Sequence, residues 1–128
     1  MAYQGVTLKG TIPDNDLTFI LASGIKEEHV GLAVAQDTSA ANTVKLAGDG
    51  DAIVGRLESF EDRTATEGVV VGAVKLVGGL ELKKSAAAMN VGDPVVGAGD
   101  GLVKTGAAAN GIVVWEVRTD SVIVIKNS

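Results

Sequence analysis

Residues 43–60, TVKLAGDGDAIVGRLESF, decide the fold. Two runs of mostly aliphatic residues, 43–47 and 52–60, flank an Ala-Gly-Asp-Gly tetrapeptide. The second run alternates in two sets, with Ile53 and Leu57 in one and Val54 and Arg56 in the other, which is typical of a β-strand. An Asp-Gly link between two such runs is a hairpin signal. The stretch therefore predicts two strands joined by a tight turn.

The same tetrapeptide recurs at residues 98–101, in VVGAGDGLVKTG, again between apolar runs. Glycine and aspartate at this density can bind phosphate, ligate calcium or reverse the chain. We interpret both copies as hairpin turns, because glycine adopts a positive φ at little cost and aspartate tolerates it better than most residues. The predicted turn residues are Gly48, Asp49, Gly50, Gly99, Asp100 and Gly101.

The two ligand-binding interpretations lack their required context. A P-loop needs Gly-x4-Gly-Lys-Ser/Thr and a dinucleotide loop opens a helix, whereas both copies run into strand-like sequence. Asp49 and Asp51 have a spacing that calcium ligands use, but the central glycine and closing glutamate of an EF-hand loop are missing. We predict no metal and no cofactor, with the aspartates solvated or at most weak cation sites.

Short apolar or alternating runs separated by turn residues continue along the chain. They include residues 17–23, 30–36, 69–77, 111–118 and 121–126. This pattern predicts an all-β fold, a small single-domain barrel or sandwich. Residues 24–29, GIKEEH, are expected to form one helical turn or a charged loop. We expect an extended N-terminal arm over residues 1–16 and the β-rich domain over residues 17–128.

The arm carries the candidate binding residues. Its segment VTLKGTI alternates weakly, and Pro13 then ends any ladder because proline has no N–H to donate. An arm of this kind cannot bury a full face by itself, but it can add a strand to a partner's sheet through main-chain hydrogen bonds. The residues expected to make the contact are Tyr3, Val6, Leu8 and Ile12.

The amino-acid composition further limits the classes of function that we expect. Hydrophobic residues make up 46% of the 128 positions but aromatic residues only 3%, so the core must be built from small aliphatic side chains. Each of these buries little area, which favours an oligomer or a partner surface. The net charge of −5 argues against nucleic-acid binding. The first ten residues lack the pattern of a signal peptide and no apolar run is long enough to span a membrane, so we expect a cytoplasmic product.

Catalytic patterns are weak throughout. The chain has no cysteine, no Gly-x-Ser-x-Gly and no His-Glu-x-x-His, and its only histidine, His29, lies in a charged segment. We therefore predict that the protein is not an enzyme. The Lys83-Lys84 pair raises the alternative of a biotinyl- or lipoyl-type carrier domain, but the setting LKKS differs from the lysine motifs of those domains, and a solvated lysine pair is the favoured interpretation.

Two longer stretches carry a family resemblance. HVGLAVAQDTSAANTVKLAGDGDAIVGRLES, followed by VGDPVVGAGDGLVKTG, resembles the capsid decoration (cement) proteins of tailed bacteriophages. In that family a valine-rich β-domain carries similar glycine turns near its strand ends. The resemblance covers residues 29–128, and the arm matches in character only.

The resemblance implies a β-tulip-like fold and a structural function. Proteins of this family bind the outer face of the phage head, usually as trimers, and hold neighbouring major capsid subunits together against internal DNA pressure. The implied partners are the major capsid protein and the chain itself, as a homotrimer, in the virion. Two alternatives remain at this point: another phage structural module, such as a fibre or tail-tip domain, and the carrier domain.

Overall fold

The computed structural model describes residues 7–8, 10–11, 16–107 and 112–126. The protein is all-β and contains a five-stranded closed barrel, which confirms the predicted fold class and decides between barrel and sandwich. The elements in chain order are β1 (Thr7–Leu8), β2 (Gly10–Thr11), β3 (Asp16–Leu21), the 3₁₀ helix η1 (Glu27–His29), β4 (Ala33–Gln36), β5 (Thr43–Leu46), β6 (Gly55–Leu57), β7 (Glu61–Arg63), β8 (Val69–Lys75), β9 (Gly78–Lys83), β10 (Val95–Gly99), β11 (Leu102–Thr105), β12 (Val114–Val117) and β13 (Ser121–Lys126).

The barrel is a ring of strands in the order β3-β5-β4-β6-β8, which closes because β8 pairs back with β3. The β3–β5 pair is parallel, with Ile20 opposite Thr43, and the other pairs of the ring are antiparallel. Closure leaves these five strands without a free edge, which removes the usual liability of an open sheet.

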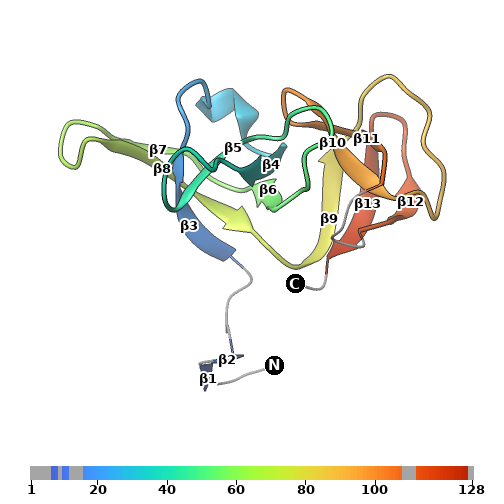
Figure 1. The fold of residues 1–128 in the computed structure, drawn as a ribbon, viewed down its shortest axis with the longest axis horizontal. Helices are drawn as coiled ribbons and strands as arrows, with labels where there is room; N and C mark the ends of the chain where they lie inside the picture. Colours follow the sequence, from blue (N-terminus) through green and yellow to red (C-terminus); the bar gives the residue numbers. More distant parts are fainter. Residues whose placement is uncertain (1–6, 9, 12–15, 108–111, 127–128) are drawn as a thin grey trace.

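A C-terminal lobe, made of β9 to β13, lies beside the barrel (Figure 1). It consists of a three-stranded antiparallel sheet in the order β12-β13-β9 and the β10–β11 hairpin. Isolated bridges between Lys84 and Val103 and between Pro94 and Val113 tie the two parts of the lobe together. The short turn predicted at residues 118–121 joins β12 to β13, where the Arg118 N–H donates to the Ser121 carbonyl.

Two clusters of aliphatic side chains form the core, and β4 separates them. Val34 points into the barrel, whereas its neighbours Ala33 and Ala35 belong to the cluster shared with the lobe. The barrel cluster consists of Leu21, Ile25, Val34, Val44, Leu57 and Val74. The shared cluster consists of Ala33, Ala35, Ala47, Ile53, Leu80, Leu82, Met89, Val95, Val103, Ile112, Val114, Val122 and Val124. Small residues on the outer face of β4 let the lobe approach the barrel wall closely.

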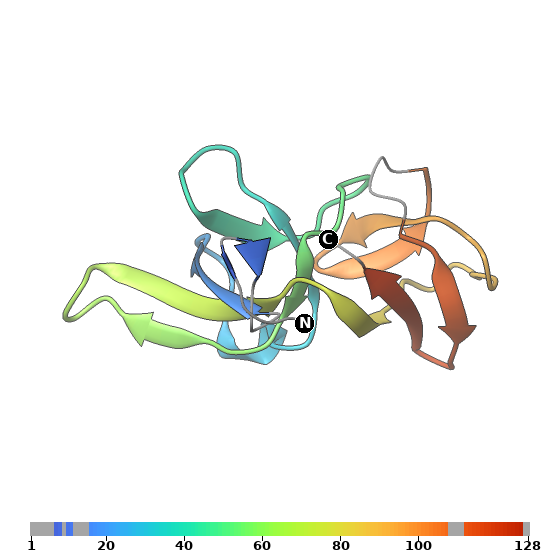
Figure 2. The same ribbon diagram turned by 90° about the horizontal axis from the view of Figure 1, so that it is seen from below.

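The β7–β8 hairpin extends beyond the barrel on the side away from the lobe (Figure 2). Where β8 crosses the barrel, Gly72 is fully enclosed, and a Cβ at this position would lie 2.2 Å from the Ser59 carbonyl oxygen. A side chain does not fit at such a distance, so the chain needs glycine there. The hairpin beyond this crossing is mostly exposed.

Candidate functional site

The second Ala-Gly-Asp-Gly copy forms the tip of the β10–β11 hairpin. Asp100 and Gly101 make the turn with φ angles of 53° and 82°, and Gly99 has a φ of 114°. These are left-handed values, which explains the choice of glycine and aspartate. The ladder shifts register between Gly97 and Gly99, so a bulge leads into the turn.

The first copy also turns the chain, but it is not the hairpin that the sequence predicts. It leads from β5 to β6, and these strands do not pair with each other, because β4 lies between them and pairs with both. The turn is closed by Asp51, whose carboxylate accepts a hydrogen bond from the Gly48 N–H at 2.8 Å and whose own N–H donates to the Gly48 carbonyl at 3.0 Å.

The two copies lie against each other, although residues 51–97 separate them in the chain. Gly50 N–H donates to the Gly97 carbonyl at 2.9 Å, and Gly97 N–H donates to the Asp51 carbonyl at 2.8 Å. Gly101 N–H donates to the Ala47 carbonyl at 3.1 Å. A hydrogen-bonded seam between the barrel and the lobe results. The copies therefore join two parts of one domain.

The aspartates of the seam already have partners within the protein. Asp49 forms an ion pair with Lys104, and the Asp51 carboxylate lies 3.5 Å from the Lys45 ammonium group. Over residues 16–107 and 112–126, no group of three or more His, Asp or Glu side chains is placed to hold a metal ion. The backbone hydrogen bonds of the seam hold the barrel and the lobe against each other.

An open groove of about 640 Å³ lies between the barrel and the lobe. Val30, Gly31 and Leu57 line it on the barrel side, and the β12–β13 turn lines it on the other. Two pairs of its charged side chains are in contact, Arg56 with Glu58 and Arg118 with Glu81. Arg56 contacts Glu58 at 2.6 Å and donates to the Glu81 carbonyl at 3.3 Å.

On the lobe side of the groove, the Ser121 hydroxyl donates to the Glu81 carboxylate at 2.6 Å, and Arg118 lies 3.7 Å from that carboxylate. Arg118 also binds Glu116 at 2.8 Å, and this contact and the charge of Glu116 raise the pKa of the guanidinium. These guanidinium groups are occupied by carboxylates of their own part, and the hydrogen bond from Arg56 to the Glu81 carbonyl links the barrel to the lobe across the groove.

The remaining sequence candidates lie at the surface or outside the described residues. His29 ends η1, and its Nδ1 accepts a hydrogen bond from the Lys26 N–H at 2.8 Å. The Lys84 ammonium group donates to the carbonyls of Ser85 and Ala87. Of the predicted arm, Tyr3, Val6 and Ile12 fall outside the described residues. Leu8 belongs to β1, which pairs with β2.

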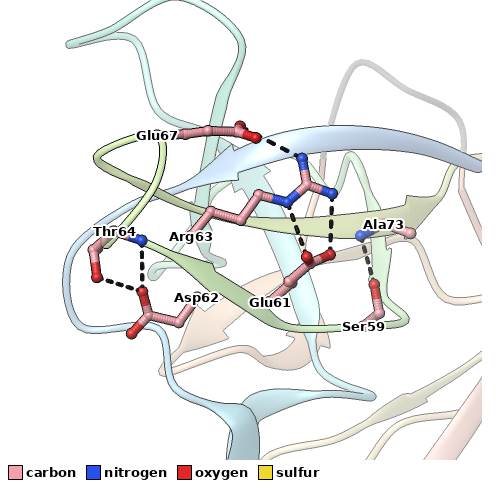
Figure 3. Close-up of polar contacts among 7 residues, drawn as sticks. All are labelled: Ser59, Glu61, Asp62, Arg63, Thr64, Glu67 and Ala73. Atoms are coloured by element: carbon pink, nitrogen blue, oxygen red, sulfur yellow. Dashed lines mark hydrogen bonds and ion pairs between the residues drawn. The ribbon is translucent and has the colours of Figure 1, made fainter.

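β7 and β12 are both edge strands of their sheets, and their side chains differ. β7 pairs only with β8 among the described strands and reads Glu61-Asp62-Arg63. Arg63 binds Glu61 at 3.0 Å and lies 3.6 Å from Glu67, while Asp62 accepts hydrogen bonds from the Thr64 N–H and hydroxyl at 2.9 and 2.7 Å (Figure 3). These contacts lower the pKa of Glu61 and of Asp62. Charged residues protect this edge against strand addition.

β12 is an edge strand of the lobe sheet and reads Val114-Trp115-Glu116-Val117. Trp115, the only tryptophan of the chain, is 61% exposed, and Val117 is 38% exposed. Val91, 67% exposed, lies in the same region, because the next residue, Gly92, donates its N–H to the Val114 carbonyl. Sequence reasoning treated β12 as an ordinary strand. The alternation of residues 111–118 groups Trp115 with Val113 and Val117 on one face, and it does not show that Trp115 is left exposed at a sheet edge.

No protein-family model, curated protein or solved structure matches the chain. In the part of the chain that the structure describes, no helix is long and apolar enough to cross a membrane.

Proposed function

We propose that the protein is a capsid decoration (cement) protein of a tailed bacteriophage. It binds the outer face of the head as a homotrimer and stabilises contacts of the major capsid protein against internal DNA pressure. What supports the proposal is a small all-β domain that exposes apolar side chains in several places, among them Leu17, Val91 and, on the β12 edge, Trp115 and Val117. Exposed apolar edges of this kind bind proteins. The glycine-turn resemblance of residues 29–128 supplies the class of partner.

The arm is the proposed capsid-binding element. Val6, Leu8 and Ile12 lie at even-numbered positions of a segment that precedes the barrel, and Tyr3 lies upstream of them. Such a segment adds to the sheet of a partner through its main chain, and apolar side chains then anchor it. The protein would be made in the host cytoplasm and reside on the virion surface, without catalysis, cofactor or contact with the genome.

Deletion of residues 2–12 tests this assignment. The first barrel strand, β3, begins at Asp16, so the deletion leaves the barrel intact. Heads assembled from the major capsid protein of the same phage are incubated with full-length or shortened protein and then pelleted. We expect the shortened protein to stay in the supernatant with an unchanged circular dichroism spectrum. Equal occupancy of the heads by both proteins would refute the role of the arm.

The trimer is tested separately, on the heads themselves. The number of decoration chains at each occupied position, counted from a reconstruction or from native mass spectrometry of released complexes, should be three. One chain per position would refute the trimer without affecting the role of the arm.

A further inference from the structure

The open edge of β12 is covered only as far as Val114. There the Gly92 N–H donates to the Val114 carbonyl at 2.8 Å, and the Val114 N–H donates to the Asp93 carbonyl at 2.9 Å. From Trp115 to Val117, no other described segment pairs with this edge. A bulge at Trp115 shifts the ladder between β12 and β13 at this point.

The direction of the free backbone groups follows from the β12–β13 turn. Arg118 donates its N–H to the Ser121 carbonyl, so the backbone of Arg118 faces β13. Because backbone groups alternate between the two edges of a strand, the N–H and C=O of Val117 face outward. One residue with both groups outward can pair with its own counterpart across a two-fold axis, each N–H donating to the other C=O.

We propose that two copies of the chain pair through β12, antiparallel, about a two-fold axis at Val117. In this register Glu116 of one copy lies opposite Arg118 of the other, and the same pair forms twice. Trp115 lies opposite Thr119 and loses much of its exposure. The contact goes beyond the proposed function, because a trimer is closed by a three-fold axis, whereas this two-fold contact joins one copy, or one trimer, to the next.

Charge favours a second copy as the occupant of this edge. The chain carries a net charge of −5, so two copies repel each other over most of their surface. Next to Val117 the strand carries one charge of each sign: Glu116 and Arg118 bind each other at 2.8 Å within one strand, and Arg118 also lies 3.7 Å from the Glu81 carboxylate. They need only exchange partners when two copies meet. The surface is therefore complementary to itself.

The β7 edge shows what prevents the same pairing elsewhere. It repeats the arrangement of an ion pair two residues apart, Glu61 with Arg63, but its central residue is Asp62. A two-fold pair centred there would place two carboxylates opposite each other, which is destabilising. The valine at the centre of the β12 arrangement removes this obstacle.

Charge reversal in the full-length protein tests the proposal. In sedimentation equilibrium, the apparent mass of the wild type should double as its concentration rises. The fluorescence of Trp115 should shift to shorter wavelength over the same range. Glu116→Arg alone places Arg opposite Arg across the two-fold axis, and Arg118→Glu alone places Glu opposite Glu. The mass of neither variant alone should therefore double with concentration. An equimolar mixture of the two should double again, because each arginine pair then meets a glutamate pair. Neither variant can form the ion pair within its own strand, whether alone or in the mixture. Recovered dimerisation in the mixture therefore cannot result from restored folding of either variant.

Two further variants complete the test. Val117→Asp copies the β7 edge onto β12 and should abolish the doubling. Glu61→Arg makes the same charge change at the β7 edge and should leave it intact. A wild type that does not double at any concentration, single variants that double like the wild type, or a mixture that fails to double would each overturn the proposal. None of these results depends on binding to heads, so the proposed function stands or falls separately.

Discussion

Residues 98–101 form the tip of the β10–β11 hairpin, whereas residues 47–50 lead from β5 to β6 past the strand between them. The four residues are the same in both places. In the second copy the turn serves two neighbouring strands and is specified locally. In the first copy the turn depends on Asp51, the next residue along the chain, and on the second copy itself. The comparison teaches that a turn motif specifies where a chain bends but not which strands it joins.

We expect the largest loss of stability from a substitution that breaks the backbone contact between the two copies. A Cβ on Gly97 would lie 2.2 Å from the Gly48 carbonyl oxygen, which is backbone and cannot move away cheaply. We expect Gly97→Ala to lower the free energy of unfolding by about 3 kcal/mol or more, measured by urea denaturation. Gly79→Ala is the matched control, because a Cβ on Gly79 meets nothing within 4 Å. Equal stability of the two variants would show that the seam does not hold the parts together.

The next largest effect on stability comes from alanine substitutions at equivalent glycines of the two copies, Gly50 and Gly101. Gly50 and Gly101 share a φ of 82°, but only Gly101 is enclosed, since a Cβ on Gly101 would lie 2.9 Å from Leu32 Cβ and close to Leu46. Gly50→Ala should cost about 1–2 kcal/mol through backbone strain alone. Gly101→Ala adds steric overlap and should cost about 2–4 kcal/mol. Thermal unfolding of the pair measures the difference, and a larger loss at Gly50 would reverse our ranking.

A smaller effect tests what closes the first turn. Asp51→Ala removes the acceptor of the Gly48 N–H and the contact with Lys45. We expect a loss of about 1 kcal/mol, as for the removal of a helix N-cap side chain. Asp51→Asn keeps an acceptor oxygen and should recover most of it in the same denaturation experiment. An alanine variant as stable as the wild type would mean that the seam alone shapes this turn.

The smallest effect concerns the ion pair at the tip of the first copy. Asp49 is exposed and pairs with Lys104 on β11, across the seam. Exposed ion pairs contribute little, so Asp49→Ala should change the free energy of unfolding by less than about 0.5 kcal/mol. A double-mutant cycle with Lys104→Ala measures the coupling. A coupling well above about 1 kcal/mol would show that this pair, and not the backbone contacts, joins the copies.

Much of the fold follows from local sequence signals. The alternation in residues 111–126 and the short polar link at 118–121 identify the β12–β13 hairpin, and Asp100-Gly101 identifies the β10–β11 turn, because each depends on residues close in the chain. The insertion of β4 between β5 and β6 and the closure of β8 onto β3 depend on contacts between distant residues. Periodicity carries no information on such contacts, so the hairpin predicted at residues 47–50 was wrong.

The candidate surfaces were harder to predict than the fold. The sequence directed attention to the arm, whose residues Tyr3, Val6 and Ile12 lie outside the described part of the chain. It did not indicate the edge at β12, because Val117 looks like any strand valine until its sheet position is known. The side chains that distinguish β12 from β7 can be seen in the sequence, but the position of both strands at a sheet edge depends on the order of strands in the sheets.

The most direct test of the central claim is an electron cryomicroscopy reconstruction of phage heads incubated with the full-length protein. The heads should be assembled from the major capsid protein of the same phage, with undecorated heads reconstructed in parallel. We predict additional density on the outer face at the three-fold and quasi-three-fold positions, with three β-domains at each. Decorated and undecorated heads with the same outer surface would contradict the claim.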